Sequence, residues 1–134
     1  KTFWKYQNQK DYVYFQEFIE DITYDLRVIV VDDKLFGYYR YPNRGDYKAS
    51  GAGNYEKREI PFEVLDIAWD VKQKYESTIL AIDFVYSPAR NKHLIIEASI
   101  FFGVDTPEQL IVGGVAGTYI RKSNGKYEFE HGKY

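Results

Sequence analysis

The chain has 134 residues, a formal net charge of -2 and an isoelectric point near 5.7. This length predicts one domain with a sizeable core, and the charge excludes the basic surface of nucleic-acid- and membrane-binding domains. The absence of cysteine excludes disulfides and thiolate metal sites, and no signal peptide or membrane-spanning run is visible, so we expect a cytoplasmic protein without nucleic-acid or membrane partners. Because the chain contains no methionine and starts at Lys1, we interpret it as a piece of a longer protein.

Aromatic residues make up 19% of the chain, with 14 tyrosines and 9 phenylalanines. Such side chains favour β-strands and binding surfaces. Two interpretations are open: a small β-rich domain whose sheet is covered with tyrosine, or an exposed platform on which sugars or bases stack.

Three strands are predicted in the first third of the chain. The aromatic run 12–19 predicts one strand, which the acidic residues Glu20 and Asp21 follow. The β-branched run 25–31 predicts a second strand, and polar residues 32–34 connect it to a third over 35–41. This short connection predicts that the second and third strands pair as an antiparallel hairpin.

A loop without an apolar pattern is predicted over residues 42–54. Its small residues Ser50, Gly51 and Gly53 would let backbone N–H groups approach an anion, with positive charge from Arg44 and Lys48. Long loops in compact domains often have a function. A flexible Gly-Ser loop has the same composition, so both interpretations stay open.

One long helix is predicted over residues 61–75. Pro61 suits its first turn, Glu63 favours its amino end, and apolar residues recur at helical spacing from Leu65 onwards. Within this helix we interpret Trp69 as a core anchor, with a ligand contact as the alternative.

The apolar runs 80–85 and 94–99 are separated by turn residues and predict an antiparallel hairpin. A turn centred midway between them places Asp83 opposite Glu97, with Phe84, Leu94 and Ile96 on the other, core-facing side. Two facing carboxylates destabilise a sheet unless a cation or proton intervenes, and they suit a magnesium ion bound to nucleotide phosphates. The alternatives are a one-residue register slip, or separate ion pairs with surface lysines or arginines.

The last part of the chain predicts a short helix and a hairpin. A capping box starts the helix at Thr106, and Gly113 and Gly114 end it. The dipeptide Asn124-Gly125 then joins strands over 118–122 and 126–129. Strands, one long helix and one short helix together predict an α+β domain with a mainly antiparallel sheet.

The order of charged residues within the strands is more specific than any single motif. Five segments follow one another: Gln16-Glu17-Phe18-Ile19, Asp25-Leu26-Arg27, Lys48-Ala49-Ser50-Gly51, Ala81-Ile82-Asp83 and Ile96-Glu97-Ala98-Ser99. This succession resembles the C-terminal lobe of ATP-grasp enzymes, of the glutathione synthetase and ribosomal-protein S6 glutamate ligase type. The resemblance covers residues 13–105 and leaves 106–134 as an extension.

The resemblance implies a chemistry and a role for each matched position. ATP would lie between two lobes with Mg²⁺ or Mn²⁺ on its phosphates, and a substrate carboxylate would become an acylphosphate that an amine attacks. The implied nucleotide contacts are Glu17, Phe18, Glu20, Asp21, Arg27, Lys48 and Ser50, with Arg27 and Lys48 as the catalytic residues. The implied metal ligands are Asp83, Glu97 and Ser99.

Three positions depart from the pattern that the resemblance implies. Lys48 stands where these enzymes often have Arg, Ser50 where many have Asn, and Ser99 where an Asn commonly completes the metal site. The N-terminal ATP-grasp lobe, with its phosphate-binding lysines, is missing from this chain.

We therefore predict the C-terminal lobe of an ATP-dependent carboxylate–amine ligase, inactive alone, with a nucleotide and a carboxylate substrate as its partners. A degenerate lobe without catalysis is the first alternative, for which Lys48 and Ser99 argue. A tyrosine-rich sugar- or peptide-binding module is the second. No Ser-His-Asp or zinc spacing is visible, and we expect the distant His93 and His131 to be surface residues.

Overall fold

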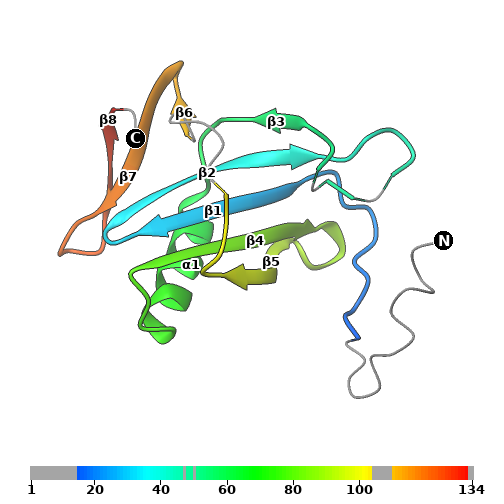
Figure 1. Cartoon of the computed structure of the whole chain (residues 1–134), viewed down its shortest axis with the longest axis horizontal. Coiled ribbons are helices and arrows are strands. Elements are labelled where there is room, and N and C mark those ends of the chain that lie inside the picture. The colour runs from blue at the N-terminus through cyan, green and yellow to red at the C-terminus, as the bar shows by residue number, and fades with distance from the viewer. Residues whose placement is uncertain (1–14, 47, 50, 104–109, 133–134) are drawn as a thin grey trace.

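The computed structural model describes residues 15–46, 48–49, 51–103 and 110–132. Within these ranges the chain forms an antiparallel sheet and one α-helix (Figure 1), which confirms the predicted α+β class. The elements are β1 (Asp25–Val31), β2 (Lys34–Tyr41), β3 (Asn54–Glu56), α1 (Phe62–Lys74), β4 (Ile79–Ser87), β5 (Lys92–Ser99), β6 (Ile111–Val112), β7 (Val115–Arg121) and β8 (Tyr127–His131). No helix among the described residues is long and apolar enough to cross a membrane.

The centre of the sheet is formed by β1, which pairs with β2 on one side and β4 on the other. The strands follow the order β5-β4-β1-β2-β7-β6, with β3 beside β2 and β8 beside β7. The predicted hairpin of β1 and β2 is confirmed, and Asp32 adopts a positive φ of 56° in its tight turn. Asp tolerates this conformation better than most residues.

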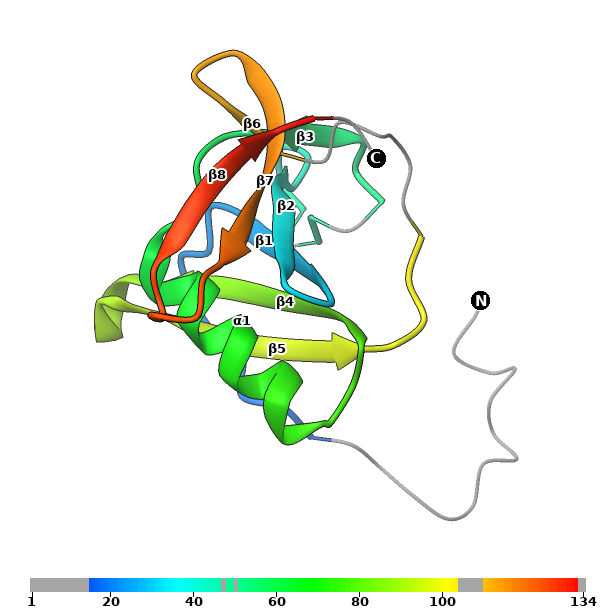
Figure 2. The ribbon, with the colours of Figure 1, turned by 90° about the vertical axis from the view of Figure 1, so that its left-hand side faces the viewer.

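The helix covers one face of the sheet. It begins after Pro61 and ends at Lys74, as predicted, and buries Val64, Leu65 and Ala68 against the strands. Figure 2 shows α1 on one side of β4 and β1, while the chain that leaves β5 passes on the other side. The predicted core anchor Trp69 is half-buried and packs against the core.

The hairpin of β4 and β5 places Asp83 opposite Glu97, which confirms the predicted pairing of these two acids. A bulge lies between Asp83 and Phe84, and beyond it Phe84 pairs with Ile95 and Val85 pairs with Leu94. An extra residue in one strand reverses the faces beyond it. The prediction that Leu94 lies on the face of Phe84 is therefore wrong.

Two further expectations about secondary structure are wrong in the described part of the chain. Phe15 to Ile19 is not a strand: the segment runs irregularly beside β5, with a hydrogen bond from Gln16 Nε2 to the Ile96 carbonyl (3.2 Å) in place of a ladder. Residues 12–14 lie outside the description. The predicted short helix does not continue to Gly113, because β6 occupies 111–112 and turns through two glycines into β7. Its start at Thr106 lies outside the described residues.

The C-terminal hairpin of β7 and β8 is confirmed around the Asn124-Gly125 turn.

The expectation that His93 is a surface residue is wrong, because its side chain is only 5% exposed. Its Nδ1 lies 2.8 Å from Glu63 on α1 and its Nε2 3.3 Å from the Tyr24 hydroxyl. These contacts attach the start of β5 to the helix through Glu63 and to the residue before β1 through Tyr24. His131 is exposed, as expected.

Candidate functional site

A cavity of about 420 Å³ lies where the segment before β1 meets the ends of the central strands. Its lining residues are Gln16, Glu17, Phe18, Ile19, Asp21, Ile22, Asp25, Pro42, Asp46, Lys48, Ala49, Val85 and Ile96. This volume falls within the range of about 300–1,000 Å³ that is typical of small-molecule sites.

Four of the predicted nucleotide contacts line this cavity together: Glu17, Phe18, Asp21 and Lys48. Glu20 does not line it, and Ser50 lies outside the described residues. The cavity thus brings together segment 16–22 and the loop after β2. The sequence predicted the order of these two segments along the chain but not their contact in space.

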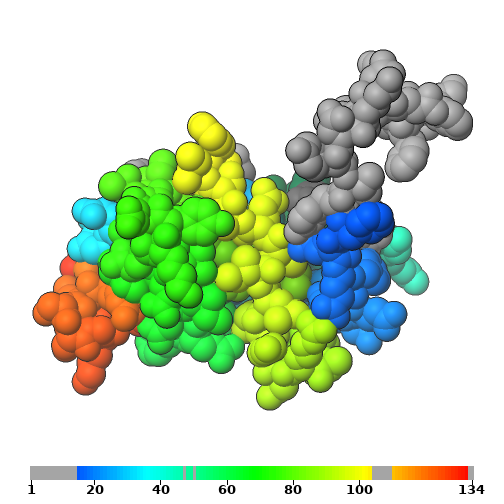
Figure 3. Space-filling model, turned by 90° about the horizontal axis from the view of Figure 1, so that it is seen from below, coloured from blue at the N-terminus to red at the C-terminus, as the bar shows by residue number. Residues whose placement is uncertain are grey.

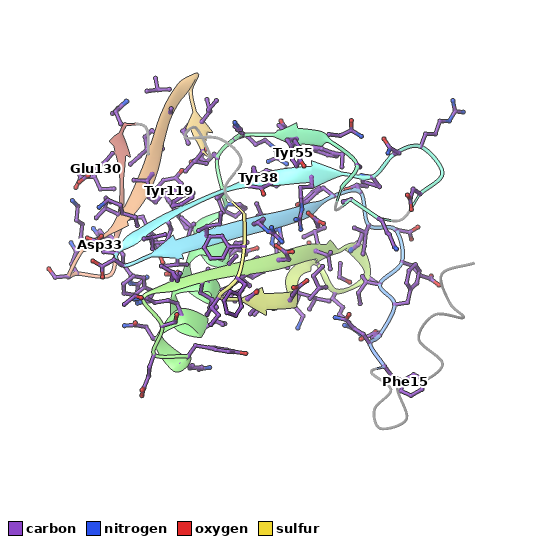
Figure 4. The ribbon with its side chains drawn as sticks, viewed as in Figure 1. Phe15, Asp33, Tyr38, Tyr55, Tyr119 and Glu130 are labelled. Atoms are coloured by element: carbon purple, nitrogen blue, oxygen red, sulfur yellow. The ribbon has the colours of Figure 1, made fainter. Side chains whose placement is uncertain are left out.

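Side-chain contacts of Gln16 and Glu17 hold the start of the segment before β1 against the β4–β5 hairpin. One is the bond from Gln16 to the Ile96 carbonyl, and the other is an ion pair between Arg90 and Glu17. Figure 3 shows β5, in yellow, between α1 in green and this segment in blue. Phe15 and Phe18 are 87% and 68% exposed, and Phe15 points away from the sheet at the start of the segment (Figure 4). Phe18 lines the cavity and Phe15 does not, and an exposed aromatic ring in a cavity wall can stack on a base.

A buried charged cluster lies on the sheet face opposite α1. Side chains alternate along a strand, and residues directly opposite each other share a face. Asp25 is opposite Arg40, and Arg27 is opposite Asp83, so these four residues share one face. The same register places Leu26 and the apolar residues beside it on the helix side.

The two arginines bind Asp83 from different strands. Arg27 donates two hydrogen bonds of 2.7 Å, from Nε to Oδ1 and from Nη2 to Oδ2 of Asp83. Arg40 donates from Nη2 to the same Oδ2 (2.8 Å) and from Nε to Asp25. Two charged pairs are thereby linked into one network, and Asp25 connects it to the cavity wall.

Burial and neighbouring charges shift the pKa values of the Asp83 and Asp25 carboxyl groups in opposite directions. Burial raises the pKa of Asp83, but hydrogen bonds and charge from Arg27 and Arg40 outweigh this effect and lower the pKa overall. Burial also raises the pKa of Asp25, and Arg40 offsets it only in part because the Asp83 carboxylate acts against it. Asp83 is therefore the more strongly ionised of the two. Hydrogen bonding to Asp83 raises the pKa of Arg27.

Of the predicted metal ligands, Asp83 and Glu97 are brought together and Ser99 is engaged elsewhere. Glu97 is exposed and makes no hydrogen bond or ion pair with any described residue. The Ser99 hydroxyl donates to the Phe101 carbonyl (2.9 Å) and accepts from the Phe101 N–H (3.1 Å).

Two facing carboxylates fit a magnesium ion on a nucleotide, which typically uses one or two carboxylates together with phosphates and water. No group of three or more His, Cys, Asp or Glu residues in the described ranges is arranged to hold a metal alone. The donor set therefore suits a metal that arrives with phosphates.

Asp25 and Arg40 stand out in the sequence as charged residues within otherwise apolar strands, but sequence reasoning did not assign them to the site. Their position was the available signal, since such residues need a partner when buried. Tyr38 was also missed: it lies opposite Arg27, hydrogen-bonds with it, and packs edge-on against Tyr55 at 5.5 Å between ring centroids (Figure 4). Of the described tyrosines only Tyr55 and Tyr75 are exposed, on separate elements, so they do not form a continuous stacking platform.

The described residues form an antiparallel sheet with a cavity and a buried charged cluster beside it, and comparison with known families identifies the class of domain. The family model of the RimK-like ATP-grasp domain matches residues 6–122. The chain therefore belongs to the RimK-like ATP-grasp family and is ligase-like in nature. No curated protein matches the chain.

Proposed function

We propose that this chain is the C-terminal lobe of an ATP-dependent carboxylate–amine ligase, and that it binds the magnesium complex of ATP. The observation that carries this proposal is the continuity of two sites. The cavity holds four residues of the implied nucleotide set, and Asp25 in its wall connects through Arg40 to Asp83. A nucleotide with its base in the cavity would direct its phosphates toward the cluster.

The cavity suits a base and a ribose. Phe18, Ile19, Ile22 and Ile96 supply apolar walls for a flat ring, and Glu17 and Asp21 supply acceptors for hydroxyl groups. Because Glu17 is paired with Arg90, its carboxylate is held at the cavity wall. Glu20 and Ser50, also implied by the family resemblance, keep their proposed nucleotide roles as predictions.

Arg27, Lys48, Asp83 and Glu97 suit the phosphates. Arg27 and Lys48 would bind phosphate oxygens, since fixed positive groups stabilise the charge of the transferring phosphoryl group. Asp83 and Glu97 would hold the magnesium ion, with Ser99 as a third ligand only after its hydroxyl leaves Phe101. The ion supplies charge neutralisation and alignment of the phosphate oxygens.

The reaction proposed for the complete protein has two steps. An oxygen of the substrate carboxylate attacks the γ-phosphorus, which forms an acylphosphate and releases ADP. An amine then attacks the carbonyl carbon, which forms an amide and releases phosphate. The carboxylate substrate, the amine and an N-terminal ATP-grasp lobe are the partners that this reaction requires. We propose that 1–134 is one domain of that protein.

An NMR titration of the full chain with Mn²⁺ and a non-hydrolysable ATP analogue tests this proposal. Paramagnetic broadening is expected around Asp83, Glu97 and Lys48, because the metal would sit between the acids and the loop. Lys48→Gln should weaken binding of the analogue by roughly tenfold. The control Lys122→Gln, on the β7–β8 hairpin with Glu128 and Glu130 as partners, should bind as the wild type does. Broadening centred elsewhere, or equal loss in both variants, would contradict the proposed site.

A nucleotide-binding lobe without catalysis is the second candidate function, and the local bonding of Ser99 favours it. With Ser99 engaged by Phe101, only two carboxylates face the phosphate region. The two candidates differ in metal dependence: the ligase lobe should lose affinity for the ATP analogue when Mg²⁺ is chelated. Binding that is unchanged by a chelator would favour the second candidate.

A further inference from the structure

Asp83 is held by two arginines that differ in exposure and in number of partners. The Arg27 side chain is 21% exposed, whereas that of Arg40 is 6% exposed. Arg27 binds one carboxylate, that of Asp83, while Arg40 bridges Asp83 and Asp25. The two arginines are therefore not equivalent as counter-ions.

The cluster is electrically balanced without a metal ion. The charges of Asp25 and Asp83 cancel those of Arg27 and Arg40, and Glu97 adds one exposed negative charge beside them. Both oxygens of Asp83 already accept hydrogen bonds from Arg27. A divalent cation at Asp83 would face the guanidinium group of Arg27 at close range, and like charges at that separation repel strongly.

We propose that Arg27 is the exchangeable counter-ion of Asp83: it holds the carboxylate in the nucleotide-free chain and moves to the phosphates when a divalent metal and a nucleotide bind. This inference rests on the proposed function and deepens it. Arg40 keeps its contact with Asp83 throughout and acts as a positioning residue. Arg27 therefore has two successive partners, a carboxylate and a phosphate, which are similar acceptors for a guanidinium fork.

The difference between the two arginines decides which one leaves. Release of Arg40 would leave Asp25 buried without its ion-pair partner, which is strongly unfavourable. Release of Arg27 leaves Asp83 paired with Arg40. The partly exposed Arg27 side chain can therefore turn to water or phosphate without leaving a buried charge unpaired. Tyr38, which lies opposite Arg27 and hydrogen-bonds with it, stays as a contact near the guanidinium group.

Such an exchange couples metal binding to nucleotide binding. Without a nucleotide, Arg27 competes with the metal for Asp83, so metal affinity is suppressed. With a nucleotide, the phosphates attract Arg27 and the suppression is relieved. The two ligands then bind with positive cooperativity, because each favours the same position of Arg27.

The test is Mn²⁺ binding to the full chain without nucleotide, followed by the electron paramagnetic resonance signal of free Mn²⁺. Arg27→Gln should bind Mn²⁺ roughly tenfold more tightly than the wild type, because a repelling charge is removed. Adding Glu97→Gln should abolish this gain. The control Arg121→Gln removes an arginine of β7 whose side chain is as exposed as that of Arg27 (21%) and which pairs with Asp66 away from the cluster, and it should leave Mn²⁺ affinity unchanged. Unchanged or weaker Mn²⁺ binding by a folded Arg27→Gln variant would overturn the proposal.

A second measurement on the wild type guards against misfolding of the variant. The Nε–H resonance of Arg27 should shift when Mg²⁺ and the ATP analogue are added, while that of Arg40 should not. An unchanged Arg27 resonance with the analogue bound would count against the exchange. The Mn²⁺ experiment contains no nucleotide, so its outcome does not depend on whether the chain binds ATP. Failure of the analogue to bind would contradict the proposed function alone.

Discussion

Replacement of Arg40 by methionine should destabilise the chain strongly, because it leaves the buried Asp25 carboxylate without its ion-pair partner. Arg40 is 6% exposed and links Asp25 and Asp83, whose side chains are 9% and 7% exposed. Methionine keeps much of the apolar stem, so the loss of charge dominates over the loss of volume. The perturbation therefore isolates the electrostatic role of Arg40 in the cluster.

The magnitude follows from the two partners. Removal of one member of a buried ion pair typically costs about 3–5 kcal/mol. Asp83 retains two hydrogen bonds from Arg27, whereas Asp25 loses its ion-pair partner. We therefore expect the lower end, about 3 kcal/mol, which corresponds to a fall in Tm of roughly 12 °C for a domain of this size. Urea unfolding followed by circular dichroism measures this change.

The stability lost through Arg40→Met should be smaller at low pH. The pKa of Asp25 is raised in the folded chain, so the folded state binds more protons than the unfolded state between the ordinary pKa of 3.8 and the folded pKa. The contribution of Asp25 to stability therefore rises as pH falls through that window. Loss of Arg40 raises the folded pKa of Asp25 further, because Arg40 lowers it in the wild type, and so extends the window to higher pH. The Arg40→Met penalty should be clearly smaller at about pH 5 than at about pH 7.5.

Two controls sharpen this experiment. In an Asp25→Asn background, Arg40→Met should cost only about 1 kcal/mol, because no buried charge is left unpaired. Arg90→Met removes the exposed partner of Glu17 and should change stability by less than about 0.5 kcal/mol. A penalty for Arg40→Met equal to that of Arg90→Met, or one that does not change with pH, would refute the reasoning.

Two further predictions concern the neighbouring strands. Glu97→Gln should change stability by at most about 0.5 kcal/mol in urea unfolding, since Glu97 is exposed and faces a carboxylate that two arginines neutralise; a loss above about 2 kcal/mol would show that Glu97 has a structural partner. Gly37→Ala should cost about 2–4 kcal/mol, because its Cβ would lie 2.0 Å from the Arg27 carbonyl oxygen. Gly132→Ala, which has open space around it, is the matched control, and equal stability of the two variants would contradict the close strand approach.

Local patterns were enough to predict most of the strands and the helix. The β-branched run of β1, the tight turn after it and the Asn124-Gly125 turn each specify structure within a few residues. The apolar periodicity of α1 did the same over its 13 residues. The predicted pairing of Asp83 with Glu97 was also correct. The strand register next to the turn differs by one residue from the predicted register, and the bulge between Asp83 and Phe84 compensates for this difference.

The errors fall where structure depends on distant partners. The aromatic run at Phe15–Ile19 has strand composition, yet these described residues are not a strand, and a side-chain hydrogen bond from Gln16 reaches β5 instead. Residues 111 and 112 became β6 because β7 pairs with them. Strand composition describes a tendency, whereas a strand exists only if a neighbour satisfies its backbone groups.

The sequence by itself determined the α+β class, the main hairpins, the helix and the order of the charged residues. Only the tertiary structure decided that Arg27 and Arg40 both bind Asp83, that Asp25 belongs to the same network, and that segment 16–22 forms a cavity with Lys48. The physical reason is that these contacts join β1, β2 and β4 across 15 to 56 residues of sequence. Alternation within one strand predicts which face a charge occupies, but the register between strands decides which charge it meets.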